Sequence, residues 1–297
     1  MNFDRELLEK GKEVESVIVS FLPIEEGWAK TVLEAMNYSV CAGGKRLRPM
    51  LMAETYKLFG GKDKVIEPFM AAIEMIHTYS LVHDDLPAMD NDEYRRGRKT
   101  TWVMYGDAMA ILAGDGLLNY AFETALKSFE MPQTDLERAA KALSILAKKA
   151  GIYGMIGGQT ADIEAQNPEI RQLLYIYEHK TAALIQAAMM VGAVLAGAND
   201  DQVKIVEQAA FEIGIAFQIQ DDILDVTSTL ETLGKPIGSD EKNQKTTYVT
   251  LQGLENASCE QKKLSNHAIE LLESLQENGF ENVFLIELIR SLITRIK

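Results

Sequence analysis

Two clusters of aspartates, each at the end of a long apolar run, are the residues of this chain best suited to chemistry. The two clusters contain Asp84, Asp85 and Asp90, and Asp221, Asp222 and Asp225. A helix C-terminus already carries partial negative charge, so carboxylates there need a cation to offset their repulsion. Carboxylates without cysteine or clustered histidine are hard oxygen ligands that favour Mg2+ or Ca2+, and Mg2+ commonly shares its ligands with substrate phosphates. Aspartate pairs also occur on solvated helix ends, but two copies predict two metal-binding platforms.

A glycine-rich basic segment supplies a candidate anion site. In Gly43-Gly44-Lys45-Arg46-Leu47-Arg48-Pro49, the glycines permit a tight turn and the proline suits the first turn of a helix. Helix-start amides, Lys45 and Arg48 would then bind a phosphate, and the guanidinium can contact two oxygens at once. A glycine turn with solvated cations is the alternative that this segment alone leaves open.

Further basic residues stand near the aspartates. Arg95 and Arg96 follow Asp90 closely in the sequence. Three separate lysines in polar surroundings are Lys180, Lys235 and Lys245. His77 precedes Asp84 by about two helical turns, so both lie on roughly the same face of one helix. Two acidic platforms and several phosphate-binding groups around an apolar interior predict a site for two diphosphates with apolar tails.

Helices must position these residues, because helical periodicity dominates nearly the whole chain. The run from Phe69 to His83 predicts a buried helix that ends before Pro87, with Asp84 and Asp85 in its last turn. The 297 residues are 47% apolar with only 7 prolines and show no linker, which predicts a single domain across 1–297. The fold class expected is therefore all-α.

Composition also limits the compartment and the partners. The net charge of −14, from 30 basic and 44 acidic residues, argues against nucleic acid as a partner. Two cysteines are too few for a disulfide framework, and the charged start of the chain lacks a signal-peptide core, so a cytoplasmic protein is expected. The alanine-rich stretch from Thr181 to Ala198 predicts a buried central helix rather than a membrane span.

In their order along the chain, these residues resemble the trans isoprenyl diphosphate synthase family, and within it the bacterial-type farnesyl diphosphate synthases. The resemblance runs from about Met36 to Tyr248. The matching motifs are residues 43–49, the His77 helix, the first aspartate cluster, Arg95-Arg96-Gly97, Gly158-Gln159 with Asp162, Lys180-Thr181, Phe217-Gln218 with the second cluster, Lys235 and Lys245. One departure is that Lys99 and Trp102 stand where bacterial members usually have proline and histidine, which puts the geometry of that loop in doubt.

The resemblance implies an isoprenoid-synthase-type bundle of roughly ten or more helices around a central cavity, usually a homodimer. It implies two to three Mg2+ ions, two held by Asp84 and Asp90 and a third by Asp221, with Asp85, Asp222 and Asp225 in support. The residues implied for the allylic diphosphate are Arg95, Lys180, Gln218, Lys235 and Lys245. Those implied for isopentenyl diphosphate are Gly44, Lys45, Arg48, His77 and Arg96. Thr181 and Gln218 would stabilise a carbocation.

The function implied is a prenyltransferase that condenses isopentenyl diphosphate with dimethylallyl or geranyl diphosphate, head to tail, to give farnesyl diphosphate. Tyr79, beside Ser80, precedes Asp84 by roughly 7.5 Å of helix, so its ring is expected to form the cavity floor that limits chain length. An aromatic residue packed in the core is the competing explanation. A geranylgeranyl diphosphate synthase and an inactive regulatory subunit remain alternatives, although both aspartate clusters are complete.

Overall fold

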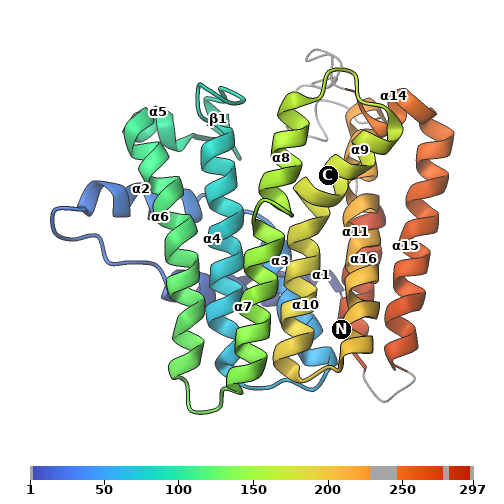
Figure 1. The fold of residues 1–297 in the computed structure, drawn as a ribbon, viewed down its shortest axis with the longest axis horizontal. Helices are drawn as coiled ribbons and strands as arrows, with labels where there is room; N and C mark the ends of the chain where they lie inside the picture. The colour runs from blue at the N-terminus through green and yellow to red at the C-terminus, as the bar shows by residue number, and fades with distance from the viewer. Residues whose placement is uncertain (1–2, 228–245, 277–280, 295–297) are drawn as a thin grey trace. The chain divides into compact units, whose positions relative to one another are not determined.

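The computed structural model describes residues 3–227, 246–276 and 281–294, and most of them are helical (Figure 1). Within these ranges the strands are two short ones, which form an antiparallel hairpin. The prediction of an all-α fold with roughly ten or more helices is confirmed. The chain divides into two compact units, Met1–Ala53 with Lys62–Leu143 and Glu54–Gly61 with Ser144–Lys297. A single domain and a central cavity stay predictions.

The first unit is built around one buried helix, α4. Its elements are α1 (Phe3–Ser20), α2 (Lys30–Val40), η1 (Lys64–Ile66), α4 (Glu67–Asp84), β1 (Tyr94–Arg95), β2 (Arg98–Lys99), α5 (Thr101–Tyr105), α6 (Asp107–Leu126) and η2 (Lys127–Glu130). Helix α4 packs against α1, α2 and α6 (Figure 1). Every residue from Phe69 to Ile76 is buried, since this run is apolar on all sides apart from Glu74. The helix ends at Asp84, where the sequence predicts its end.

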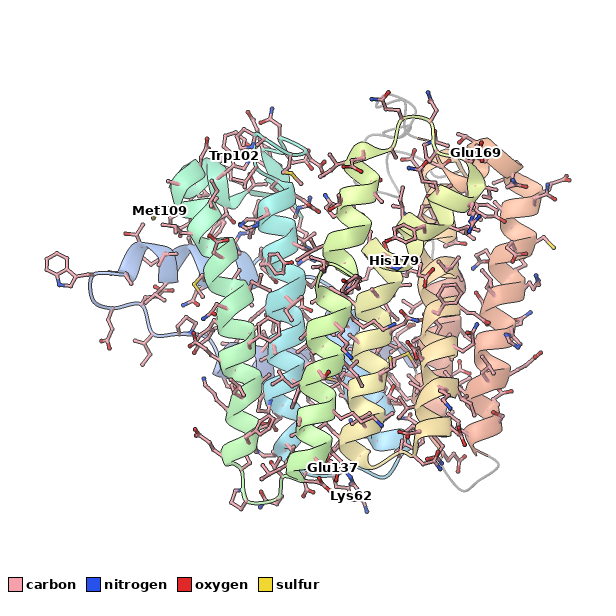
Figure 2. The ribbon with its side chains drawn as sticks, in the orientation of Figure 1. Lys62, Trp102, Met109, Glu137, Glu169 and His179 are labelled. Atoms are coloured by element: carbon pink, nitrogen blue, oxygen red, sulfur yellow. The ribbon has the colours of Figure 1, made fainter. Side chains whose placement is uncertain are left out.

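The second unit is built around α10 and α11. Its elements are α8 (Met155–Glu164), α9 (Ile170–Ile176), η3 (Tyr177–Ala182), α10 (Ala183–Ala196), α11 (Asp200–Thr227), α14 (Tyr248–Gln252), α15 (Leu254–Gln276) and α16 (Val283–Thr294). The residues of α3 (Leu47–Leu58) and α7 (Leu136–Ala150) are divided between the two units. Helix α11 packs against α10, α15 and α16. Side chains fill the spaces between neighbouring helices of each unit (Figure 2).

The segments α9, η3 and α10 follow one another without a break and form one long apolar helix. Among the described residues, Ile170–Ala196 is long and apolar enough by length and composition to cross a membrane. However, 78% of its most apolar window is buried inside the fold, as in the core helix of a globular unit. This burial agrees with the expectation of a buried central helix around Thr181–Ala198.

Candidate active site

The first aspartate cluster surrounds the end of α4. Asp84 is the last helical residue, Asp85 caps the helix and is almost fully buried, and Asp90 is exposed on the loop beyond. The backbone N–H of Asp90 donates to the carbonyl of Asp84 over 2.8 Å, so the loop turns back over the helix end. The three carboxylates therefore belong to one short stretch of backbone, as the sequence predicts.

Arg95 lies against the buried carboxylate of this cluster. Its Nε donates to Oδ1 and Oδ2 of Asp85 over 2.7 and 3.0 Å, and its Nη2 forms an ion pair with Oδ1 at 2.6 Å. Burial raises the pKa of Asp85, and the hydrogen bond from Arg95 opposes that shift. In the structure Arg95 thus neutralises a carboxylate of the first cluster, and its contact with an allylic diphosphate stays a prediction.

Arg95 ends the first strand of a hairpin that helical periodicity does not predict. Strands β1 and β2 pair with Tyr94 opposite Lys99 and Arg95 opposite Arg98, which leaves Arg96 and Gly97 as a two-residue turn. Both turn residues have positive φ, 53° and 74°, as a type I′ turn requires. The only sequence signal for this turn is Gly97, which adopts that conformation without strain.

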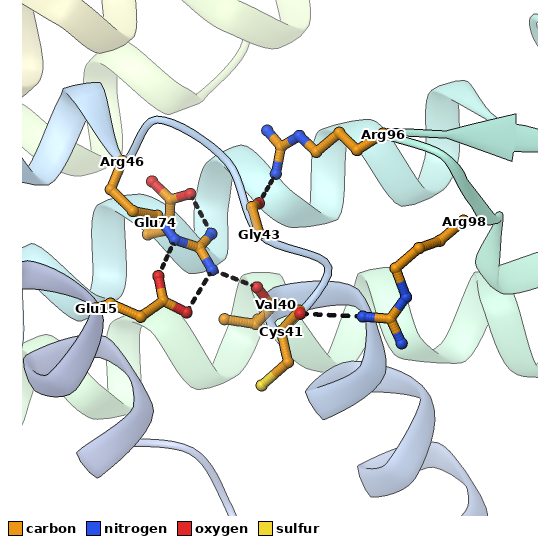
Figure 3. A network of polar contacts seen from close by, with 8 residues as sticks. All are labelled: Glu15, Val40, Cys41, Gly43, Arg46, Glu74, Arg96 and Arg98. Carbon is orange, nitrogen blue, oxygen red and sulfur yellow. Dashed lines mark hydrogen bonds and ion pairs between the residues drawn. The ribbon is translucent and has the colours of Figure 1, made fainter. Parts of the chain in front are cut away.

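The turn of the hairpin touches the glycine-rich segment. Nη1 of Arg96 donates to the carbonyl of Gly43 (Figure 3). The φ of Gly44 is 136°, a conformation that strains any other residue, and a Cβ there would also push the Arg96 guanidinium out of its present place. The structure thus brings together Gly44 and Arg96, two of the residues predicted for isopentenyl diphosphate.

Arg46, to which the sequence assigns no role, holds this segment from beneath (Figure 3). The residue is only 3% exposed and has a left-handed backbone, φ 47°. Its Nε donates to Glu15 over 2.6 Å, its Nη1 to Glu74 over 2.7 Å, and its Nη2 to the carbonyl of Val40 over 2.6 Å. Burial acts to lower the pKa of Arg46, but the hydrogen bonds with both glutamates outweigh it and raise that pKa.

The other residues predicted for isopentenyl diphosphate are Lys45, Arg48 and His77, and the last two lie close to Arg96. Lys45 is exposed, while Arg48 and His77 are half-buried. Burial and the charge of Arg96 lower the pKa of Arg48 to about 10, although Glu74 acts to raise it. Burial, followed by the charges of nearby arginines, lowers the pKa of His77 well below its usual value. A bound diphosphate would offset this crowding of positive charge.

In the second unit, Lys180 and Thr181 lie in η3, a π-helical turn. Nζ of Lys180 is 2.5 Å from Oδ2 of Asp162, and the hydroxyl of Thr181 donates to Oε1 of Gln218 over 3.1 Å. A Cβ at Gly158 would lie 2.1 Å from the backbone N of Lys180, so α8 can approach η3 only with glycine there. Single π turns are frequent at functional sites. The structure brings these predicted residues together, and their roles stay predictions.

The second aspartate cluster occupies the last two turns of α11. Gln218, Asp221 and Asp225 are half-buried and share one face through their three-and-four spacing. Asp222 is 3% exposed, and its Oδ2 accepts hydrogen bonds from the hydroxyl of Tyr177 over 2.5 Å and the N–H of Tyr248 over 2.8 Å. Asp222 is therefore used inside the fold. The predicted Lys235 and Lys245 lie outside the described residues.

The carboxylates match a hard divalent cation by their chemistry. Within residues 3–227, 246–276 and 281–294, no three His, Cys, Asp or Glu side chains converge on one metal position. Aspartate oxygens alone, with part of the coordination left to water and substrate, are the donors that suit Mg2+. The residues present therefore fit Mg2+ held jointly with diphosphate oxygens.

The predicted floor residues both belong to α4. Tyr79 is 6% exposed, and its ring stands edge-on to His83 with 5.9 Å between centroids. Among the described residues its buried hydroxyl has no hydrogen-bond partner, and burial and the charge of Asp84 raise its pKa to about 12. The Ser80 hydroxyl donates to the carbonyl of His77 over 2.9 Å. Tyr79 is thus the bulky apolar group of this pair.

The loop region that includes Lys99 and Trp102 is also ordered by hydrogen bonds. Nε1 of Trp102, which Figure 2 labels, donates to the carbonyl of Asp92 over 2.9 Å. The backbone carbonyl of Lys99 accepts from the hydroxyl of Tyr38 over 2.7 Å. These two contacts tie both ends of the hairpin region to its surroundings.

Comparison with known protein families assigns this chain to a family. A family model described as polyprenyl synthetase matches residues 29–284 of the 297. The chain belongs to the polyprenyl synthetase family. The resemblance seen in the sequence is therefore confirmed, and the chain is a trans-prenyltransferase by family.

Individual polyprenyl synthetases resemble this chain over nearly its full length. The farnesyl diphosphate synthase of Geobacillus stearothermophilus is 41% identical, over 97% of this chain and 97% of its own. The geranylgeranyl diphosphate synthase of Cyanophora paradoxa is 42% identical, over 89% and 88% of the two chains. The crystal structure of an FPP/GFPP synthase from Zymomonas mobilis has a TM-score of 0.83 and 31% identity, over 99% and 98%. Relatives of similar identity thus carry names for different product lengths.

Proposed function

We propose that this polyprenyl synthetase is a farnesyl diphosphate synthase that uses Mg2+. It condenses isopentenyl diphosphate with dimethylallyl diphosphate and then with geranyl diphosphate, so that chain growth stops at fifteen carbons. The observation that carries the product length is the buried ring of Tyr79 on the helix that ends at Asp84. At the usual helical rise the ring lies roughly 7.5 Å below the aspartate, where a growing prenyl chain would meet it.

The reaction begins when the bond between C1 of the allylic substrate and its diphosphate oxygen breaks. Diphosphate leaves with the bonding electrons, and Lys180 and Arg95 balance its charge. Asp84, Asp90 and Asp221 would hold Mg2+, which would supply further positive charge to the leaving group. The double bond of isopentenyl diphosphate attacks the resulting allylic cation and forms the new carbon–carbon bond. The departing diphosphate accepts the proton lost, so no nucleophilic side chain is required.

Neighbouring residues of the chain would hold the reactants. The cluster of Gly44, Lys45, Arg48, His77 and Arg96 is the proposed site for the diphosphate of isopentenyl diphosphate. The Thr181 and Gln218 oxygens, which lie 3.1 Å apart, are proposed to stabilise the cation. The π turn supports this role because its backbone carbonyls depart from the usual helical pairing. The Lys235 and Lys245 roles rest on the resemblance alone.

A homodimer in the cytoplasm is the proposed physical form. Helix α6 exposes the apolar side chains of Ile111, Leu112 and Leu126, each between 46% and 49% exposed, and such groups favour burial in an interface. The cytoplasm and the lack of a nucleic-acid partner rest on composition.

Product analysis tests the proposed function. Purified protein is incubated with Mg2+, isopentenyl diphosphate and either dimethylallyl or geranyl diphosphate, and the products are dephosphorylated and sized by chromatography. Mainly farnesol supports the proposal. If the products are geranylgeraniol or longer alcohols, the proposed reaction stands but the protein is a longer-chain synthase. If the folded protein forms no product, it is a regulatory subunit rather than an active synthase.

A further inference from the structure

Three arginines hold the loop between α2 and α3, each through a different backbone carbonyl (Figure 3). Arg46 donates to Val40 from beneath the loop, and Arg96 donates to Gly43 from the hairpin turn. Nη1 of Arg98 donates to the carbonyl of Cys41 over 3.1 Å. The carbonyls at the end of a helix such as α2 carry partial negative charge, so cationic donors suit them.

Arg98 has no role in the proposed reaction, yet it makes a second specific contact. Its guanidinium carbon lies 4.6 Å from the ring centroid of Tyr38, in cation–π geometry. The hydroxyl of the same tyrosine donates to the carbonyl of Lys99. Tyr38, near the end of α2, therefore contacts strand β2 at two points, the side chain of Arg98 and the backbone carbonyl of Lys99.

The hairpin needs such external support. Each strand has only two residues, and an isolated two-stranded hairpin is at best marginally stable in water. Its turn also places a non-glycine residue, Arg96, in the left-handed region. The ion pair of Arg95 with Asp85 fixes one side of the hairpin to α4. The contacts of Arg98 fix the opposite side to the loop between α2 and α3.

We propose that Arg98 is a positioning residue that holds hairpin β1–β2 against the loop and so sets the place of Arg96 in the isopentenyl diphosphate subsite. This proposal rests on the proposed function, because it assigns that subsite to isopentenyl diphosphate. The allylic subsite depends less on Arg98, since Arg95 has its own hydrogen-bonded ion pair with Asp85.

The adjacent lysine provides a matched control. Arg98→Met keeps the apolar stem and removes the donors, while Lys99→Met removes the same charge from the next residue. The side chains of both residues are exposed, and strand β2 contains both. Because the two variants have the same net charge, each attracts an anionic substrate at long range equally weakly compared with wild type. A difference in Kd between them therefore comes from the contacts of Arg98.

Isothermal titration of each protein with isopentenyl diphosphate, without allylic substrate, measures the affinity of the subsite directly. We expect Arg98→Met to raise Kd about tenfold, because the hairpin would then hold Arg96 in place in only about a tenth of the molecules and the apparent affinity falls with that fraction. Lys99→Met should stay within about twofold of wild type, and Arg98→Lys should recover part of the loss. In steady-state assays the KM for isopentenyl diphosphate should rise with Kd, while the KM for geranyl diphosphate and the melting temperature change little.

Equal Kd values for Arg98→Met and Lys99→Met would overturn the proposal. A melting temperature that falls together with both KM values would also overturn it, because that pattern indicates a general structural role. Wild-type protein that binds isopentenyl diphosphate but forms no product would contradict the proposed function alone, and the comparison of Kd values would still decide the role of Arg98.

Discussion

The hydroxyl of Tyr177 lies 2.5 Å from Oδ2 of Asp222, and the N–H of Tyr248 donates to the same oxygen. One carboxylate thus joins the first residue of the π turn, the second aspartate cluster and the first residue of α14. A single buried acceptor serves three segments that are far apart in the sequence. The buried Asp222 carboxylate therefore holds the π turn and the start of α14 against α11.

Removing one oxygen tests this arrangement. Tyr177→Phe deletes the donor and leaves the ring, so we expect a loss of about 1–3 kcal/mol in the free energy of unfolding, the usual value for a buried hydrogen bond to a charged group. Because the donor also positions the π turn, kcat should fall by about tenfold. Urea unfolding and steady-state kinetics measure the two effects.

Two further variants separate positioning from metal binding. Tyr175→Phe is the control, since Tyr175 is exposed and stacks on His179. Asp222→Asn keeps an oxygen that accepts from both donors, so its half-saturating Mg2+ concentration should match that of wild type. A rise of tenfold or more would show that Asp222 binds metal.

The Arg46 cluster predicts a large stability effect. Arg46→Met leaves Glu74 buried without its partner, which costs about 3–5 kcal/mol when a buried ion pair is broken on one side. Glu74→Gln should cost less, because the amide oxygen still accepts a hydrogen bond. The exposed pair of Arg5 with Glu9 is the control, and Arg5→Met should change unfolding by less than about 1 kcal/mol. Equal losses in the buried and exposed variants would rule out the structural role assigned to Arg46.

The lowered pKa of His77 predicts that the folded protein loses stability as the pH falls. Its pKa in the folded protein lies well below the ordinary 6.5, so below that pH the unfolded chain binds a proton that the folded chain does not. The stability of wild type should therefore fall, relative to His77→Gln, as pH decreases from about 6.5, by at most about 1.4 kcal/mol per pH unit. Urea midpoints between pH 5 and 7.5 measure this difference. Parallel curves for the two proteins would contradict the prediction.

Tyr79 predicts separate effects of its ring and its hydroxyl. Tyr79→Ala removes the ring, so we expect products longer than fifteen carbons together with a stability loss of about 3–5 kcal/mol. Tyr79→Phe keeps the ring and removes a buried hydroxyl without a partner among the described residues, so product length should persist and stability should not fall. Chromatography of the dephosphorylated alcohols checks the first point, and an unchanged profile for Tyr79→Ala would remove Tyr79 from the floor.

Metal dependence tests the aspartate platforms. Chelation with EDTA should abolish activity, and Mg2+ should restore it. Asp84→Asn and Asp221→Asn should each raise the half-saturating Mg2+ concentration by about tenfold or more. Asp201→Asn is a suitable control, because this substitution removes the same charge at the exposed start of α11. Identical Mg2+ curves for all three variants would exclude metal binding by both clusters.

Local signals in the sequence were sufficient for the helices and for the helical positions of several candidate residues, whose roles stay predictions. The end of α4 follows from an apolar run interrupted by Pro87, and the face shared by Gln218, Asp221 and Asp225 follows from helical spacing. Both depend on residues near one another in the chain, which is why pattern alone predicts them.

Tertiary contacts decide the features that the sequence did not predict. Arg46 looks like one more solvated cation in its motif, and its burial depends on Glu15 and Glu74, which are distant in sequence. The hairpin is too short to show strand periodicity, so only the Arg96-Gly97 turn could have indicated it. The contacts of Asp222 join three segments that no local pattern connects.

The π turn at Tyr177–Ala182 also bears on how this site could be gained or lost in evolution. A π turn amounts to an α-helix with one residue too many, so deletion of a single codon would restore regular winding. Every side chain before the deletion would then rotate by about 100° relative to α10. One such event would turn Lys180 or Thr181 away from its present neighbours while the buried helix stayed intact.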